Sequence, residues 1–250
     1  MKPCKTRMAA IISKVPGLFC LGFLSLSLIQ GVSAQPNAGN ARNMAPIDLS
    51  GNWVSLVTEH WRYRIVTAGP GEVSGYELTE LGMRIAQNWD PAVDTANGEA
   101  CKSYGAAGIM RQPTRLQISW ENDNNLRIDT DAGMQTRNLK FGDAQDNAGA
   151  GSWQGVSNAQ WKLHGQNGTL EVETRNMRPG YLLRNGIPYS DQAVMQEYFE
   201  LIEGADGAQY LVVVSIVNDP VFLEAPAITS TNFRRESDNS GWSPEECIAE

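Results

Sequence analysis

Short segments in which apolar and polar residues alternate follow one another between residues 115 and 235, separated by turn-forming residues. Alternation at a period of two is typical of a β-strand with one face on a core. The same pattern over residues 48–66 predicts an opening strand, and Asn167-Gly168 is typical of a tight hairpin turn. The later predicted strands are Leu116–Trp120, Leu126–Thr130, Gln135–Phe141, Ala159–His164, Thr169–Arg175, Ala193–Ile202, Gln209–Val217 and Ile228–Arg235.

About nine sequential strands close most easily into an antiparallel up-and-down barrel, because closure removes exposed strand edges. A two-sheet β-sandwich is the alternative fold. One helix is predicted over residues 78–89, where apolar residues recur at helical spacing after Thr79, a residue that can cap a helix. Residues 97–110 are expected to be irregular or briefly helical. Residues 142–152 form a Gly-rich insertion, and residues 177–190 a long loop.

The first 34 residues have the pattern of a signal peptide, with a basic start, an apolar run and small residues ending at Ala34. Cleavage there predicts a periplasmic or secreted protein, with a flexible leader over residues 35–47 and one barrel domain over residues 48–250. Without the four basic residues of that segment, 16 Lys and Arg face 28 Asp and Glu, a net charge of −12. So acidic a chain is not expected to bind nucleic acid or anionic lipid, and no later apolar run predicts membrane insertion.

Two cysteines, Cys101 and Cys247, remain after cleavage, and in an oxidising compartment we expect them to form a disulfide. With two histidines they could make a zinc site, but none of the four lies at the short spacings of such sites, so no metal is predicted. The sequence also lacks a Gly-x-Ser-x-Gly motif, a phosphate loop and a Gly-x-Gly-x-x-Gly motif. Hydrolase, kinase and nicotinamide-dependent functions are therefore disfavoured, and no cofactor is predicted.

The Gly51-Asn52-Trp53 motif on the opening strand resembles the start of lipocalins and of the wider calycin barrels. The resemblance implies that an arginine of the last strand, Arg234 or Arg235, stacks over the indole of Trp53. Two further blocks, residues 61–64 and 177–190, resemble a group of secreted bacterial proteins of uncharacterised function. The early helix and the 177–190 loop depart from a minimal eight-stranded barrel, and the resemblance supplies no catalytic residues.

Several charged residues on the predicted strands are candidates for acid–base chemistry inside the barrel. If their faces point inward, a carboxylate there can act as a general base while an arginine stabilises the developing charge. The sequence thus predicts a cofactor-independent lyase, isomerase or dehydratase that acts on a hydrophobic or aromatic small molecule. If the faces point outward, the charges are simply solvated. The candidate bases are Glu59, Asp129 and Glu197, and the candidate charge stabilisers are Arg62, Arg64 and Arg137.

Aromatic and basic residues are candidates for ligand binding. Those of the 177–190 loop either form the rim of a pocket or fasten the loop to the barrel. The rivals to the enzyme are a non-catalytic periplasmic carrier of a hydrophobic small molecule and a structural envelope protein with a filled barrel. The sequence predicts neither the ligand's identity nor the oligomeric state. The candidate ligand-binding residues are Trp53, His60, Trp61, Trp161, Arg178, Tyr181, Tyr189 and Tyr198.

Overall fold

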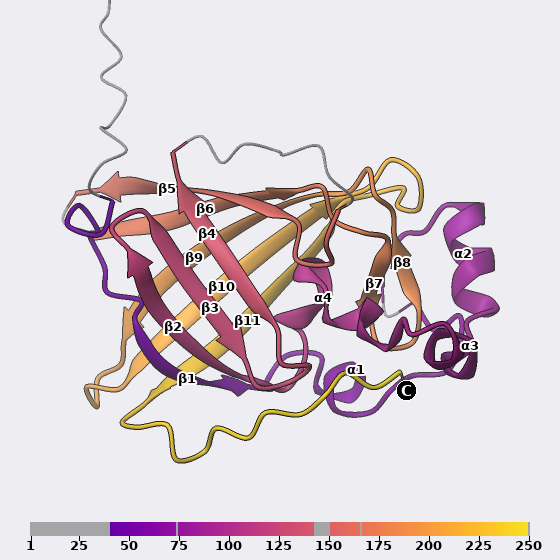
Figure 1. Cartoon of the computed structure of the whole chain (residues 1–250), viewed down its shortest axis with the longest axis horizontal. Coiled ribbons are helices and arrows are strands. Elements are labelled where there is room, and N and C mark those ends of the chain that lie inside the picture. Colours follow the sequence, from indigo (N-terminus) through magenta and orange to yellow (C-terminus); the bar gives the residue numbers. More distant parts are fainter. Residues whose placement is uncertain (1–40, 74, 143–150, 166, 250) are drawn as a thin grey trace, which may run out of the picture. The chain divides into compact units, whose positions relative to one another are not determined.

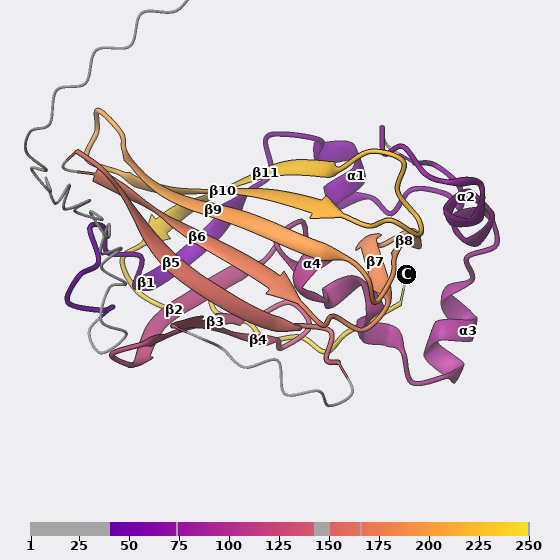
Figure 2. The same cartoon turned by 90° about the horizontal axis from the view of Figure 1, so that it is seen from above.

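Nine strands form a closed barrel in the computed structural model, which describes residues 41–73, 75–142, 151–165 and 167–249 (Figures 1 and 2). Around the barrel the order is β1-β11-β10-β9-β6-β5-β4-β3-β2, and β1 pairs with both β2 and β11. The predicted all-β barrel is confirmed. The barrel strands are β1 (Gly51–Leu56), β2 (Arg115–Asn122), β3 (Asn125–Thr130), β4 (Thr136–Phe141), β5 (Val156–His164), β6 (Asn167–Arg175), β9 (Val194–Glu203), β10 (Gln209–Asn218) and β11 (Ala227–Glu236).

The connectivity departs from a simple up-and-down barrel at two places. β4 pairs with β5 in parallel, whereas the other pairs of neighbouring barrel strands are antiparallel. The predicted loop over residues 177–190 contains a hairpin of β7 (Gly180–Leu183) and β8 (Ile187–Tyr189), which lies outside the barrel sheet. Because the hairpin leaves the sheet, β9 returns beside β6.

The opening strand is shorter than predicted, because β1 ends at Leu56 and the residues after it turn into helix α1 (Trp61–Ile65). The prediction of a strand through residue 66 is therefore wrong. His60 sits at the start of α1 with a φ of 48°, in the left-handed region, and this turn redirects the chain. Arginines that would have shared one strand face thus stand on a helix, where they point in different directions.

The predicted early helix is present as α2 (Glu80–Gln87), where the Thr79 hydroxyl accepts a hydrogen bond of 3.1 Å from the Gly82 amide. It ends two residues before Trp89. Short helical segments follow and lie at the same end of the barrel as the β7–β8 hairpin (Figures 1 and 2). These segments are α3 (Pro91–Ala96), the 3₁₀ helix η1 (Ala100–Tyr104) and α4 (Ala106–Ile109).

Two apolar clusters hold the fold together. The first fills the barrel interior with inward residues of the strands and the end of α4. The second packs α2, α4 and the β7–β8 hairpin against the barrel end, which we call the capped end. Burying each large apolar side chain contributes roughly 1.5–3 kcal/mol, so the cap is an integral part of the fold. The aromatic members are Trp53, Tyr104, Phe199 and Phe233 in the first cluster and Tyr189 in the second, which also contains Met177, Ile187 and Met195.

Trp53 lies fully buried beneath the guanidinium of Arg235, which is 4.3 Å from the centre of its ring. Its indole N–H donates to the Leu49 carbonyl at 3.0 Å, and Arg235 donates to the carbonyls of Asp48 (2.7 Å) and Ser50. The stacking implied by the Gly-x-Trp resemblance is therefore present. Arg235 makes it, whereas Arg234 is exposed on the outer face of β11.

The segment before β1 differs from the predicted flexible leader. Ala41 is buried, and its carbonyl accepts a hydrogen bond of 3.0 Å from the indole of Trp161. Ile47 packs against the interior cluster. Residues 41–47 are thus fastened to the barrel, while the predicted signal peptide lies outside the described residues.

A disulfide joins Cys101 of η1 to Cys247 near the end of the chain, with the two Cα atoms 5.0 Å apart. The predicted disulfide is confirmed. It holds the C-terminal tail beside β3, where the Glu245 amide donates to the Asp131 carbonyl at 2.9 Å. Among the described residues, no helix combines the length and apolar character needed to cross a membrane.

Replacing both cysteines by serine should lower the free energy of unfolding by about 2–5 kcal/mol, because a crosslink over a long loop restricts the unfolded chain. The crosslinked residues are 146 positions apart in sequence. Urea titration followed by circular dichroism measures the difference. Cys101→Ser alone should cost about as much as the double replacement. A double variant as stable as the parent would contradict the prediction.

Candidate functional site

Two arginines share one carboxylate at the capped end of the barrel. Arg64, on α1, has a side chain that is 0% exposed and forms an ion pair with Oε1 of Glu59. Arg111, just after α4, is 5% exposed and has its Nη1 atom 3.7 Å from the same oxygen. Two predicted site residues, Glu59 and Arg64, are therefore brought together. Their common partner, Arg111, was not predicted.

Backbone carbonyls and a histidine orient the two guanidiniums. Arg64 donates to the carbonyls of Arg111 (3.1 Å) and Leu56 (3.3 Å), while Arg111 donates to the Ser230 carbonyl at 3.3 Å. Nη2 of Arg111 also lies 3.3 Å from Nδ1 of His60. Because a guanidinium only donates, Nδ1 accepts in this contact, which leaves Nε2 to carry the proton of the neutral ring.

The two oxygens of Glu59 have different surroundings. Oε1 forms ion pairs with the guanidiniums of Arg64 and Arg111. Oε2 accepts hydrogen bonds from two neutral groups, the Thr58 hydroxyl at 2.8 Å and the Asn232 amide at 3.4 Å. The Glu59 side chain is 27% exposed, so this carboxylate faces both solvent and the buried arginines.

The site carries more buried positive charge than Glu59 balances. Within the described part of the chain, Glu59 is the one carboxylate within 4 Å of either guanidinium. Desolvation lowers the pKa of Arg64 to about 10; Glu59 opposes this shift and the neighbouring Arg111 adds to it. Nη2 of Arg64 and Nε of Arg111 are buried and find no hydrogen-bond partner among the described residues. A buried donor without a partner costs about 1–3 kcal/mol, which an anion at this position would offset.

A small pocket opens beside these donors, and its free volume is about 10 Å³, enough for one water-sized atom. Arg184, from the β7–β8 hairpin, also borders it and donates to the carbonyls of Arg64 (3.4 Å) and Ile65 (3.0 Å). On the outside of α1, Trp61 is 60% exposed and Ile65 is 55% exposed. The pocket is lined by Tyr63, Arg64, Arg111, Gln112, Leu182, Leu183 and Arg184.

A second predicted pair, Arg137 and Glu197, lies inside the barrel with both side chains 0% exposed. The two hydrogen bonds between guanidinium and carboxylate measure 3.1 and 2.5 Å. Thr174 accepts a third bond from Arg137 at 3.4 Å and is itself 2.8 Å from the Ser157 hydroxyl. Both predicted residues point inward as expected. The two charges balance one to one and both oxygens of Glu197 accept from Arg137, although Nε of Arg137 finds no partner among the described residues.

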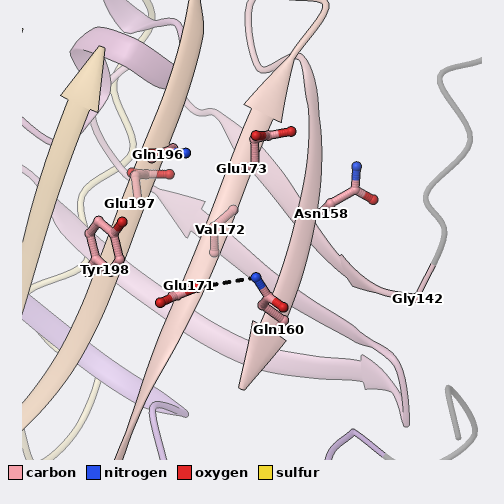
Figure 3. Close-up of a pocket in the computed structure, with 9 residues that line it drawn as sticks. All are labelled: Gly142, Asn158, Gln160, Glu171, Val172, Glu173, Gln196, Glu197 and Tyr198. Carbon is pink, nitrogen blue, oxygen red and sulfur yellow. Dashed lines mark hydrogen bonds between the residues drawn. The ribbon is translucent and has the colours of Figure 1, made fainter. Parts of the chain in front are cut away.

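Asp129 and Tyr198 do not face the barrel interior, so the outward alternative holds for these two residues. Asp129 pairs with Arg127 on the outer face of β3, at 2.7 and 2.9 Å. Tyr198 borders an open depression of about 400 Å³ on the outer faces of β5, β6 and β9, together with Glu171 and Gln160 (Figure 3). Further depressions of about 370 and 320 Å³ lie outside β1–β3 and beside the disulfide.

The residues predicted on the 177–190 loop fasten it to the cap. Tyr181 donates to both oxygens of Asp94 (2.9 and 3.2 Å); burial and this hydrogen bond raise its pKa to about 12. Arg178 lies 4.4 Å from the ring centre of Trp153. Tyr189 is fully buried, and burial raises its pKa. Tyr189 is therefore not at a pocket rim, and the observed contacts correspond to the fastening alternative.

The predicted tryptophans and Arg62 fall into different places. Trp53 and Trp161 belong to the barrel core and are anchored by hydrogen bonds to backbone carbonyls. Trp61 and Arg62 are exposed on α1, beside the arginine cluster but not within it. The prediction therefore assigned the right segment, residues 59–64, to the candidate site. Because that segment was predicted to be a strand, its side chains were assigned to the wrong faces.

Two residues of the site, Arg111 and Asn232, were missed. Arg111 follows a Gly- and Ala-rich stretch with no periodicity to indicate its direction. Arg184 belongs to the 177–190 loop, whose basic and aromatic residues were candidates for the rim of a pocket, and it does line this one. Asn232 stands at alternate positions with exposed residues of β11, so its strand face could have been predicted from alternation.

Comparison with known proteins adds no family to this description. The chain matches no protein-family model, and the search of curated proteins found no significant match. Across the described ranges, no group of three or more His, Cys, Asp or Glu side chains is arranged to hold a metal ion.

Replacing Glu197 by Gln should lower the free energy of unfolding by about 3–5 kcal/mol, because it leaves the buried Arg137 charge without a counter-charge. Chemical denaturation of the two proteins measures the loss. Glu171→Gln is the matched control: its partner Lys162 is 3.6 Å away on the partly exposed outer wall, and such a pair contributes about 0–1 kcal/mol. Equal effects at the two positions would contradict a buried, fully paired Arg137–Glu197.

Proposed function

We propose that the chain is an exported binding protein for a hydrophobic or aromatic small molecule that carries an acidic group. The observation that carries this proposal is the pair of buried guanidiniums, Arg64 and Arg111, which share Glu59 and keep two N–H donors unpartnered among the described residues. Guanidiniums bind carboxylates through parallel, charge-assisted hydrogen bonds, and a water-poor setting strengthens them.

The two parts of such a ligand would meet two adjacent surfaces. One oxygen of the acid fits the small pocket between Arg64, Arg111 and Arg184. The apolar body would lie over the exposed side chains of Trp61 and Ile65, which stand one helical turn apart on α1 and so share a face. Burial of this exposed apolar surface would add to the binding free energy.

Export is part of the proposal and rests on the signal-peptide pattern of residues 1–34. The disulfide Cys101–Cys247 supports it, because such bonds persist in oxidising compartments.

Binding is favoured over catalysis inside the barrel because the carboxylate there, Glu197, is already hydrogen-bonded to Arg137 through both oxygens. On β9, Met195 and Phe199 lie on either side of Glu197 on the same inward face. A general base must reach the proton that it removes, either directly or through a single water molecule. The Glu197 side chain is 0% exposed and both of its oxygens accept from Arg137, so a ligand in solvent cannot contact it directly.

An acid–base enzyme that uses Glu59 is the second candidate. Oε2 of Glu59 is bound only by neutral donors and lies on a partly exposed side chain, so it could accept a proton from a molecule held by Arg64 and Arg111. The lyase, isomerase or dehydratase predicted from the sequence would then operate at the capped end.

Benzoate and benzamide, which have nearly the same shape and differ in charge, test the proposed binding site. Benzoate should bind at least about tenfold more tightly, a difference of about 1.4 kcal/mol, because only the carboxylate can pair with both arginines. Calorimetric titration at constant ionic strength measures both affinities. Arg111→Gln should bring the two affinities within about twofold, whereas the exposed Arg62→Gln on the same helix should change neither.

Trp61→Ala should weaken benzoate and benzamide alike, because it removes surface that both rings contact. Equal binding of the two compounds by the parent protein, or no binding of either, would contradict the proposed function. Glu59→Gln separates the candidates: a binding protein should gain affinity for benzoate as the arginines are released. For an enzyme, the same variant should abolish turnover of the molecule that co-purifies from the host and is identified by mass spectrometry.

A further inference from the structure

The strand β10 is apolar on both of its faces. The run Leu211–Val217 is interrupted only by Ser215, a pattern typical of strands that are covered on both sides. Leu211, Val213 and Val217 point into the barrel and are buried. The intervening Val212, Val214 and Ile216 point outward and stay partly exposed.

The neighbouring strands extend this outer surface. In the sheet register, Tyr198 of β9 lies beside Val214, and Ile228 of β11 lies beside Ile216. Ile202 is 49% exposed and Ile228 is 63% exposed. We call this surface the apolar stripe. It consists of Tyr198, Ile202, Tyr210, Val212, Val214, Ile216 and Ile228.

Charges of opposite sign lie on the two sides of the apolar stripe. On the β9 side, Glu200 is exposed, and Glu171 and Glu173 stand on the outer face of β6 beyond it (Figure 3). On the β11 side, Arg234 is exposed and forms no ion pair within the described part of the chain. When two copies pack face to face with one rotated by 180° about the direction of β10, the basic side of each copy faces the acidic side of the other.

We propose that a second copy of this chain covers the apolar stripe, packed face to face about a two-fold axis that runs along β10. This axis places the β11 side of one copy over the β9 side of the other. Arg234 aligns with Ile202 across the sheet, through Tyr210, so each Arg234 would lie over β9 of the second copy. Glu200 is the next outward residue there, about 7 Å along the strand and within reach of a long side chain.

The charge pattern selects this occupant over others. An acidic flank opposes contact with an anionic membrane surface or a nucleic acid. A two-fold axis across the strands would place β9 over β9, so that the acidic side of one copy faces the acidic side of the other, and like charges at an interface are unfavourable. The axis along β10 is the arrangement that joins the apolar rows and also pairs the charges. The apolar stripe adjoins the ligand site, because Val212 and Val214 pair with Asn232 and Ser230, which contact Glu59 and Arg111. The dimer does not rest on the proposed function, and the oligomeric state is measured without a ligand.

Analytical ultracentrifugation of the full-length chain tests the inference. The parent protein should sediment at twice the mass of the chain at micromolar concentration. Val214→Glu should raise the dissociation constant at least about a hundredfold, since it buries a charge in the interface. Leu163→Glu, at an exposed apolar position of β5 that lies away from the stripe, is the matched control and should leave the dimer intact. A monomeric parent protein, or a dimer unaffected by Val214→Glu, would overturn the proposal.

A charge exchange at two exposed residues tests the orientation. Arg234→Glu and Glu200→Arg should each weaken the dimer at least about tenfold by facing like charges, which corresponds to about 1.4 kcal/mol. The double variant should recover most of the parent affinity. If the two single effects instead add up in the double variant, the proposed two-fold axis is wrong.

Discussion

Closure of the sheet by β1 is the constraint on which the rest of the structure depends. β1 has only six residues, yet it pairs with β2 on one side and with β11 on the other, so its removal would expose two strand edges. Trp53 and Arg235 reinforce this closure from within, because each is tied to the chain just before β1. The position of β1 also decides where the chain leaves the barrel, and hence where α1 and its arginine lie.

The molecule buries charge at two places, the Arg137–Glu197 pair inside the barrel and the Arg64–Glu59–Arg111 group at the capped end, and the two differ in how the charge is balanced. Arg137 and Glu197 balance each other one to one in the interior, where removal of either partner would leave an uncompensated buried charge. At the capped end, Arg64 and Arg111 have one shared carboxylate, which leaves the charge unbalanced. The imbalance, rather than the burial, is what distinguishes a candidate binding site from a structural one.

Alternation along the sequence predicted the strands from residue 115 onward because the period of two is a local property of each segment. Alternation could also have predicted the orientation of Asp129. Its neighbours Ile128 and Thr130 are buried and point inward, so Asp129 between them faces outward. Residues 59–66 were misread because the alternation of aromatic and basic side chains continues through a helix of five residues. The turn at His60 has no periodic signature, and the contact between Arg64 and Arg111 joins segments far apart in sequence, so neither could be predicted.

The disulfide also makes the attachment of the tail a condition for closing the crosslink. Cys101 lies in η1 and Cys247 lies 146 positions later, so the bond can form only once the tail has come to lie beside β3. A chain whose tail fails to dock keeps a reactive thiol at position 101. Alkylation of that thiol would therefore count molecules with an undocked tail without any assay of activity.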